Sequence, residues 1–294
     1  MTRPTFFLVG APKCGTTSLC HYLSQHPDIF MLDRKEIHFL TSDLDIPTRY
    51  RTESEYLNIF ARTTRPHSGE GSTWYLYSTA AAHGIHKLNR HVKIIISLRR
   101  PADMVYSLFR FRQYIGVERS SCLENALARE SEYLSNLGHK TKVNPSYIYC
   151  DAAMYYRHVE RYIEIFGSTS VHVVLFDELK NDPEKVYQGI LQFLGVRGDF
   201  RPAFTHVNKT GRIRSEGFQQ FIAHLPGPVK RLAYAVPRGI RRPAYRALHR
   251  LNTSYAPPSP LDPELLRCLS NQFRPDVERL SALIGRNLTH WCAE

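Results

Sequence analysis

A glycine-containing loop near the start of the chain carries the residues best suited to chemistry. The segment Gly10–Thr17 reads GAPKCGTT and follows a short apolar run, Thr5–Val9, that predicts a buried strand. Glycines in such a loop let backbone N–H groups turn towards an anion, and the start of the following helix adds a partial positive charge. A plain structural turn is the alternative. We expect an anion-binding loop made of Lys13, Cys14, Gly15, Thr16, Thr17 and Ser18.

The position of the lysine within this loop indicates which anion the loop binds. The two glycines have the spacing of a Walker A loop, but Thr16 stands where that loop has its lysine, and Lys13 lies inside the loop instead. Triphosphate sites neutralise their ligand with that lysine and Mg²⁺. A less charged group, such as a sulfuryl group, can be transferred without a metal ion, so none is expected. Lys13 and the two threonines would stabilise charge that develops on a leaving phosphate.

Other cations follow further along the chain. The run Val92–Leu98 is continuous and β-branched, as in a buried parallel strand, and Arg99 comes directly after it. Ser107 lies two turns into the predicted helix Ala102–Tyr114. Ligands bind at the carboxyl ends of such strands, where an arginine fork and a hydroxyl can hold a phosphate, although a solvated arginine is the alternative. A later polar loop, NKTGRIRS, adds Arg212 and Arg214.

The pattern of elements predicts an α/β fold. Strands alternate with helices, which is typical of a parallel sheet flanked by helices. The sequence favours a single domain, 1–294, with a basic helical appendage at about 226–294. Besides those above, the predicted elements are the strand Val171–Phe176 and the helices Thr16–Ser24, Asp151–Phe166, Pro183–Leu194 and Glu264–Ile284.

Composition and charge limit the class of protein. The chain has 294 residues with 43% hydrophobic residues and a formal net charge of +12, so it is long enough for a sizeable core and suggests an anionic partner. Its six cysteines lack metal-binding spacing, and reduced thiols fit a cytosol best. The apolar run before Gly10 is too short for a signal peptide or a membrane span, and no other stretch approaches one. We expect a cytoplasmic protein.

Three segments together resemble the sulfotransferases that use 3′-phosphoadenosine-5′-phosphosulfate (PAPS), in the branch of bacterial and glycan sulfotransferases. They are VGAPKCGTTSL, LRRPADMVYS and HVNKTGRIRS, and KEIHFL, the stretch from VLFDELK to FLGV and the C-terminal tail agree more weakly. The resemblance covers nearly the whole chain in order. It implies a P-loop-NTPase-like sheet flanked by helices, PAPS as the sulfuryl donor and a hydroxyl or amine acceptor.

The resemblance also implies roles for single residues. The loop from Lys13 to Ser18 corresponds to the site of the 5′-phosphosulfate, Arg99 and Ser107 to the pair that holds the 3′-phosphate, and Arg212 and Arg214 to a later cofactor-binding loop. Glu36 matches the general base of glycan sulfotransferases. The sequence departs from the pattern at Gly71, where some of these enzymes have a catalytic lysine.

His38 is the remaining candidate for catalysis. If Glu36 and His38 share one extended segment, the alternation of side chains places both on the same face, so His38 could assist the base or replace it. The alternatives are a surface carboxylate paired with Arg34 or Lys35, and, for His38, a packing role, which we favour.

Two other functions stay open at this point. A P-loop kinase or NTPase would share the loop but needs a Gly-Lys-Ser/Thr sequence and Mg²⁺ ligands, which the loop lacks. A non-enzymatic polyanion-binding protein would use the basic stretch Val229–Arg250, although a solvated basic helix face explains that stretch as well. No nucleic-acid-binding motif accompanies this stretch, and we do not expect a nucleic acid as a partner. The acceptor (a glycan, a lipid or a small molecule) and the oligomeric state cannot be deduced from the sequence.

Overall fold

The computed structural model describes residues 3–32, 35–138, 141–205 and 260–292, the stretches 212–215, 217–219 and 252–254, and residues 236, 239, 243, 247 and 248. Most of the basic stretch Val229–Arg250 therefore lies outside the described residues.

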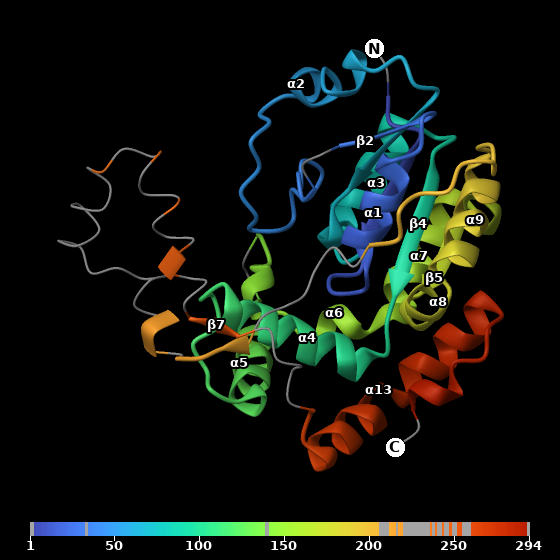
Figure 1. Ribbon diagram of the computed structural model, residues 1–294. Helices are drawn as coiled ribbons and strands as arrows, with labels where there is room; N and C mark the ends of the chain where they lie inside the picture. Colours follow the sequence, from blue (N-terminus) through green and yellow to red (C-terminus); the bar gives the residue numbers. More distant parts are fainter. Residues whose placement is uncertain are drawn as a thin grey trace.

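The centre of the fold is a parallel sheet of five strands in the order β2-β3-β1-β4-β5. Figure 1 labels β2, β4 and β5 of this sheet, with helices around it. From β1 the chain first adds β2 and β3 on one side and then crosses to add β4 and β5 on the other. Ligands of open α/β sheets bind where such a crossing occurs, at the carboxyl ends of the strands. The expected α/β fold is confirmed, with strands β1 (Phe6–Gly10), β2 (Ile29–Met31), β3 (His67–Gly71), β4 (Lys93–Leu98) and β5 (Val171–Leu175).

Helices cover both faces of the sheet because successive strand residues point to opposite sides. In β1, Phe6 and Leu8 pack with helices α1 and α9, whereas Phe7 and Val9 pack with α3, α4, α7 and α13. All four side chains are fully buried. The helices are α1 (Thr16–Ser24), α2 (Glu53–Leu57), α3 (Thr79–Leu88), α4 (Pro101–Tyr114), α5 (Leu123–Ser135), α6 (Cys150–Ala153), α7 (Tyr155–Phe166), α8 (Phe176–Asn181), α9 (Pro183–Leu194) and α13 (Pro263–Ile284), and the short strands β6 (Arg212–Ile213) and β7 (Thr253–Ser254) form an antiparallel pair.

The C-terminal helix is part of the main core. Leu269, Phe273, Val277 and Leu280 of α13 are buried in the same apolar cluster as Phe7 of the central strand. These residues recur at helical spacing, so one face of α13 packs against the domain. The helical end of the region expected as an appendage therefore contributes to the packing of the sheet.

One expected helix is interrupted. The segment Asp151–Phe166 was expected to be continuous, but α6 ends at Ala153 and α7 begins at Tyr155, with Met154 in a non-helical conformation between them. The Asp276 carboxylate of α13 accepts the backbone N–H of Tyr156 at 3.2 and 3.3 Å. A free N–H at the start of α7 thus gains a partner from a distant helix, which the local sequence could not reveal. The strand expected at Val171–Phe176 is one residue shorter, because Phe176 begins α8.

Substitutions at two glycines can test the packing of this core. A Cβ atom at Gly69 of β3 would lie 2.1 Å from the buried ring of Phe6, whereas one at Gly189, inside α9, would meet no atom within 4 Å. We expect Gly69→Ala to lower the free energy of unfolding by about 1–3 kcal/mol through overpacking, and Gly189→Ala to raise it by up to about 1 kcal/mol through helix propensity. Urea denaturation measures both variants. Equal shifts for the two would contradict this packing.

Candidate active site

A cavity of about 650 Å³ lies at the carboxyl ends of the three central strands. Its lining combines residues that follow β1, β3 and β4 with parts of α1 and α4. A volume of this size accommodates a ligand of nucleotide size. Most of the residues expected from the sequence line it, namely Lys13, Gly15, Thr16, Thr17, Ser18, Glu36, His38, Arg99 and Ser107.

The loop after β1 is fixed to the neighbouring strand. The backbone N–H of Ala11 donates to the carbonyl of Ser97 at 2.7 Å, and the Ser97 hydroxyl donates to the carbonyl of Cys14 at 2.5 Å. Gly15 immediately precedes α1 with φ 81°, a left-handed conformation that suits glycine. A Cβ atom there would lie 2.7 Å from Leu179, so both conformation and space require a glycine.

Lys13 is the cation inside this loop. Its Nζ lies 4.2 Å from the centre of the Phe111 ring, in a cation–π contact. Burial lowers the pKa of Lys13 to about 8, and the positive charges of Arg99 and Lys35 add to the effect. A neighbouring anion would favour the charged form. Lys13 is thus a cation that lacks an anionic partner among its described contacts.

Arg99 and Ser107 lie on the β4 side of the cavity. Arg99 directly follows β4, and its guanidinium carbon lies 4.8 Å from the centre of the Phe176 ring. Its nearest carboxylate, Asp103, is 4.0 Å away, so the guanidinium keeps most of its donors available. Ser107 reaches the same cavity from the second turn of α4, as expected. Both side chains are therefore available to a ligand bound in the cavity.

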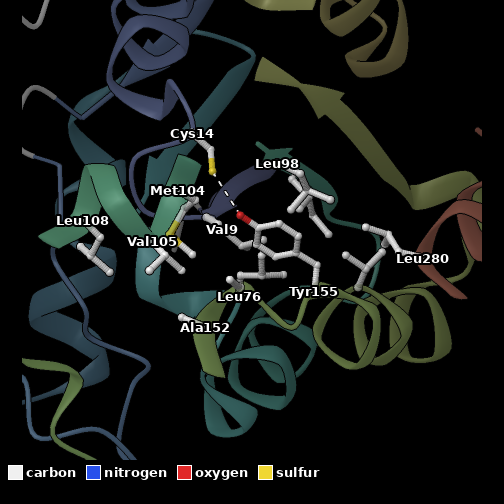
Figure 2. Close-up of a cluster of buried hydrophobic side chains, with 14 of the residues drawn as sticks. Val9, Cys14, Leu76, Leu98, Met104, Val105, Leu108, Ala152, Tyr155 and Leu280 are labelled. Carbon is white, nitrogen blue, oxygen red and sulfur yellow. Dashed lines mark hydrogen bonds between the residues drawn. The ribbon is translucent and has the colours of Figure 1, made fainter. Parts of the chain in front are cut away.

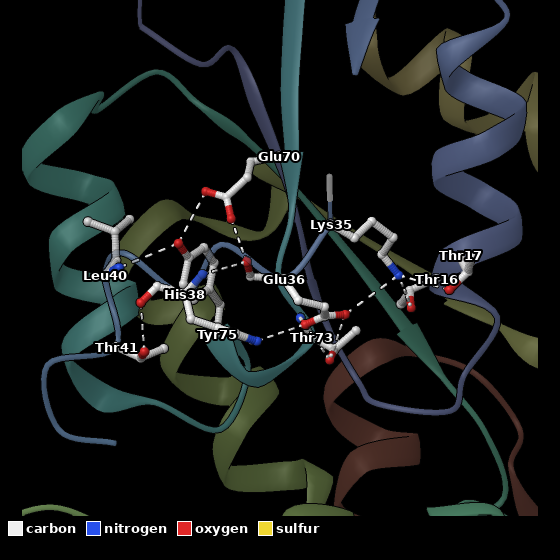
Figure 3. Close-up of polar contacts among 11 residues, drawn as sticks. Thr16, Thr17, Lys35, Glu36, His38, Leu40, Thr41, Glu70, Thr73 and Tyr75 are labelled. Carbon is white, nitrogen blue, oxygen red and sulfur yellow. Dashed lines mark hydrogen bonds and ion pairs between the residues drawn. The ribbon is translucent and has the colours of Figure 1, made fainter. Parts of the chain in front are cut away.

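Glu36 and His38 both line the cavity, and their side chains lie beside each other (Figure 3). Their segment is not extended as expected, because both residues have left-handed backbones with φ 64° and 54°. Nevertheless, His38 Nε2 lies 3.0 Å from Glu36 Oε2. Glu36 also accepts the backbone N–H of Thr73 at 3.0 Å and pairs with Lys35 at 3.7 Å. The alternatives expected from the sequence were a Glu36–Lys35 pair and a packing role for His38. Both are partly present, since Glu36 pairs with Lys35 and His38 is buried, but these residues line the cavity.

The surroundings of Glu36 keep it charged. Burial by itself would raise the pKa of its carboxyl group, but the hydrogen bond with His38, the charge of Lys35 and the N–H of Thr73 outweigh this effect. The pKa therefore lies below its usual value. Glu36 is a carboxylate at neutral pH and can accept a proton from a hydroxyl or ammonium group placed beside it.

A second carboxylate, Glu70 of β3, supports this arrangement from behind. It is fully buried and accepts hydroxyl hydrogen bonds from Tyr56 at 2.5 Å, Ser72 at 2.5 Å and Tyr75 at 3.1 Å. The Ser72 hydroxyl in turn accepts the backbone N–H of His38 at 3.1 Å. Burial raises the pKa of Glu70 despite these bonds. Glu70 thus holds the end of β3 and, through Ser72, the segment that carries His38.

Two expected residues, Cys14 and Arg214, do not line the cavity, and a third, Arg212, has a side chain that lies outside the described residues. The Cys14 side chain points into the apolar core, where its Sγ lies 3.8 Å from the hydroxyl of Tyr155 (Figure 2), so only its backbone is close to the loop's ligand side. Arg214 is exposed, and its backbone N–H donates to the carbonyl of Asn252. For Arg212 the described backbone pairs with Ser254 in β6 and β7, and its side chain lies outside the described residues, as does Arg34.

The sequence did not single out several residues that the cavity contains. Lys35, Thr73 and Phe111 all line it. Trp74 lines it too, and from the sequence it could stack on a sugar or adenine, although core packing is the commoner use of such a residue. Lys35 directly precedes Glu36, so the basic–acidic pair was visible, but its contact with the loop after β1 was not. The aromatic residues had no signal, because core helices use the same residue types at the same spacing.

Comparison with known proteins decides the family. The model of the sulfotransferase domain matches residues 3–210, which include the loop after β1, Glu36, Arg99 and Ser107. This chain belongs to the sulfotransferase family. The expected resemblance and the expectation of an enzyme of this class are confirmed.

Curated relatives are sulfotransferases that act on heparan sulfate. Mouse heparan sulfate glucosamine 3-O-sulfotransferase 5 is 25% identical over 195 residues, covering 66% of this chain and 54% of the mouse protein. Human bifunctional heparan sulfate N-deacetylase/N-sulfotransferase 2 is 26% identical over 212 residues, covering 66% of this chain and 22% of the human protein. The present chain thus spans about half the length of the mouse protein and a smaller share of the length of the human protein.

A solved structure agrees over the whole chain. The crystal structure of a sulfotransferase from Alicyclobacillus acidocaldarius is 29% identical, with a TM-score of 0.74 and complete coverage of both chains. The likeness confirms the expected fold, a P-loop-NTPase-like sheet flanked by helices. Within the described part of the sulfotransferase, no helix is long and apolar enough to cross a membrane.

The placement of the loop after β1 predicts how two thiols react. In the folded sulfotransferase Cys14 is fully buried, and burial raises its pKa to about 12, whereas Cys268 of α13 is exposed. The thiolate is the reactive form, so we expect brief treatment with iodoacetamide to alkylate Cys268 and spare Cys14. Peptide mass spectrometry measures both sites, and unfolding in urea before treatment should make both reactive. Rapid alkylation of Cys14 in the folded protein would show that the loop is oriented differently.

Proposed function

We propose that this sulfotransferase transfers the sulfuryl group of PAPS to a hydroxyl or amine group of an acceptor. The observation that carries the proposal is the lining of one cavity by cations and a carboxylate. Lys13 and Arg99 follow two adjacent strands, and Glu36 lies beside the end of a third. A donor with phosphate groups at two positions needs separate cations, and transfer to a hydroxyl needs a base.

On the donor side, each residue has a distinct task. The N-terminus of α1 with Thr16, Thr17 and Ser18 would hold the 5′-phosphosulfate, and Arg99 with Ser107 would hold the 3′-phosphate. Lys13 would stabilise the bridging oxygen as the bond between sulfur and the leaving phosphate breaks. Contacts of Arg212 and Arg214 with the donor stay predictions of the sequence.

On the acceptor side, Glu36 would take the proton of the attacking hydroxyl or ammonium group while the new bond to sulfur forms. His38 would hold the carboxylate in place through the contact at 3.0 Å. Positioning and electrostatics carry most of the catalysis in a transfer of this kind, and a general base contributes about 10²–10⁴-fold.

The acceptor in this proposal is a glycan or a small molecule. The relatives that act on heparan sulfate support a sugar hydroxyl or amino group, and Trp74 beside the catalytic groups offers a surface on which a sugar can stack. A lipid acceptor, a single domain over 1–294 and a cytoplasmic location stay predictions of the sequence.

Transfer of labelled sulfur tests the function and its base together. With sulfur-35-labelled PAPS and panels of glycans, phenols, lipids and amines, we expect labelling of at least one acceptor. Glu36→Gln should lower turnover at least about tenfold, because the amide accepts no proton, and leave nucleotide affinity nearly unchanged. Glu164→Gln, a change at an exposed position of α7, is the matched control. Normal turnover in Glu36→Gln would remove this residue from the mechanism.

The lowered pKa of Lys13 predicts how binding depends on pH. Because that pKa is about 8 and a bound anion raises it, binding of adenosine 3′,5′-bisphosphate should take up a proton near and above pH 8. Affinity should then fall as the pH rises from about 7 to about 9.5, since more of the free protein has a neutral lysine.

Titration calorimetry in two buffers of different ionisation enthalpy measures both the affinity and the proton uptake. Lys13→Met should bind more weakly and lose the proton uptake, whereas Lys180→Met, at an exposed position of α8, should behave like the wild type. Tight binding of ATP with Mg²⁺ and no binding of the bisphosphate would overturn the proposed function in favour of an NTPase.

A further inference from the structure

Lys35 lies between the proposed base and the loop that would hold the donor. Its Nζ donates hydrogen bonds to the hydroxyls of Thr16 at 2.9 Å and Thr17 at 3.1 Å, and it lies 3.7 Å from Glu36 Oε1 (Figure 3). The side chain is 15% exposed and lines the cavity. Its position is therefore set by both halves of the site, unlike that of a surface lysine.

The two hydrogen bonds also orient the threonine hydroxyls. A hydroxyl has one proton, and an ammonium group has donors but no acceptor. Because each threonine oxygen accepts from Lys35, its own proton is left to point elsewhere. The first turn of α1 thus keeps two hydroxyl donors for an anion while Lys35 adds a positive charge beside it.

The end of β3 leaves room for this lysine. Gly71 accepts the backbone N–H of Glu36 at 2.9 Å and so fixes the segment that carries Lys35. A Cβ atom at Gly71 would lie 3.4 Å from Lys35 Cε and 2.7 Å from Cys20 Sγ. A Cβ atom at position 71 would therefore crowd Cys20 and come into van der Waals contact with the aliphatic part of Lys35.

The proposed reaction explains why a cation at the position of Lys35 would be useful. The proposed donor carries a negative sulfuryl group at the end held by Thr16 and Thr17, and the base is a carboxylate 3.7 Å from the lysine that bonds to both threonines. Two like charges this close repel each other in a partly buried site. A cation between them removes the repulsion and lets Glu36 stay charged next to the anion.

We propose that Lys35 determines the affinity of this site for the sulfated donor: its ammonium group contacts the sulfuryl oxygens and separates their charge from the Glu36 carboxylate. This inference rests on the proposed function. The bond between sulfur and the 5′-phosphate breaks, the bond to the acceptor forms and the acceptor's proton goes to Glu36, while Lys35 keeps its protons throughout.

The test compares two nucleotides that differ only in the sulfuryl group. We expect Lys35→Met to weaken binding of PAPS by about tenfold or more, and binding of adenosine 3′,5′-bisphosphate by less than about threefold, in titration calorimetry without an acceptor. Lys35→Arg should keep the preference for PAPS, since it retains the charge. Lys180→Met is the matched control for loss of a lysine.

A double variant separates this role from a structural one. In Lys35→Met, the additional change Glu36→Gln removes the repelling carboxylate and should restore most of the lost PAPS affinity. If Lys35 only stabilised the fold, the double variant would show no rescue, and Lys35→Met would lose affinity equally for both nucleotides. Either result would overturn the inference and leave the proposed function standing. If the wild type binds neither nucleotide, the proposed function fails and the inference fails with it.

Discussion

Positive charge held in a partly buried cavity is the constraint on which the site depends. Lys13, Lys35 and Arg99 line one cavity, where Lys35 lies 3.7 Å from Glu36 and Arg99 lies 4.0 Å from Asp103, while Lys13 has no carboxylate among its described contacts. Burying charges without partners costs free energy, and the lowered pKa of Lys13 reflects that cost. The proposed donor, with anionic groups at both of its ends, would offset this cost.

The rest of the fold keeps these charges in place. Three adjacent parallel strands end at the cavity, and each positions one part of it: the loop after β1, the segment that docks on β3 and the arginine after β4. Side-chain bonds from inside the sheet reinforce this, since Ser97 fixes the loop and Glu70 fixes Ser72 and thereby His38. Changes in Ser97, Glu70 or Ser72 would move the site although none of these three lines the cavity.

Aromatic rings hold the cations when no anion is present. Lys13 lies over Phe111 of α4, and Arg99 lies over Phe176 at the start of α8. Both rings stand on helices that pack against the sheet, so they present a fixed surface. A cation–π contact is weaker than a charge-assisted hydrogen bond to a phosphate. The two cations are thus oriented in advance but remain available to a ligand.

The sequence by itself determined the elements and the chemistry of the loop. Strands, helix starts and helix ends are local patterns of apolar residues, glycines and prolines, so the bounds of α1 and α9 and the positions of Lys13 and Arg99 at strand ends could be predicted. The sequence predicted that Glu36 and His38 lie close together, but from an extended segment. In the structure the two residues have left-handed backbones, and their side chains nevertheless meet.

Only the tertiary structure decided which distant residues meet. Lys35 donates hydrogen bonds to Thr16 and Thr17, and Asp276 of α13 accepts the backbone N–H of Tyr156, more than a hundred residues earlier. Glu70 finds three hydroxyl partners in the core. These contacts depend on strand order and helix packing, which are set by the burial of the whole chain, so no local pattern encodes them.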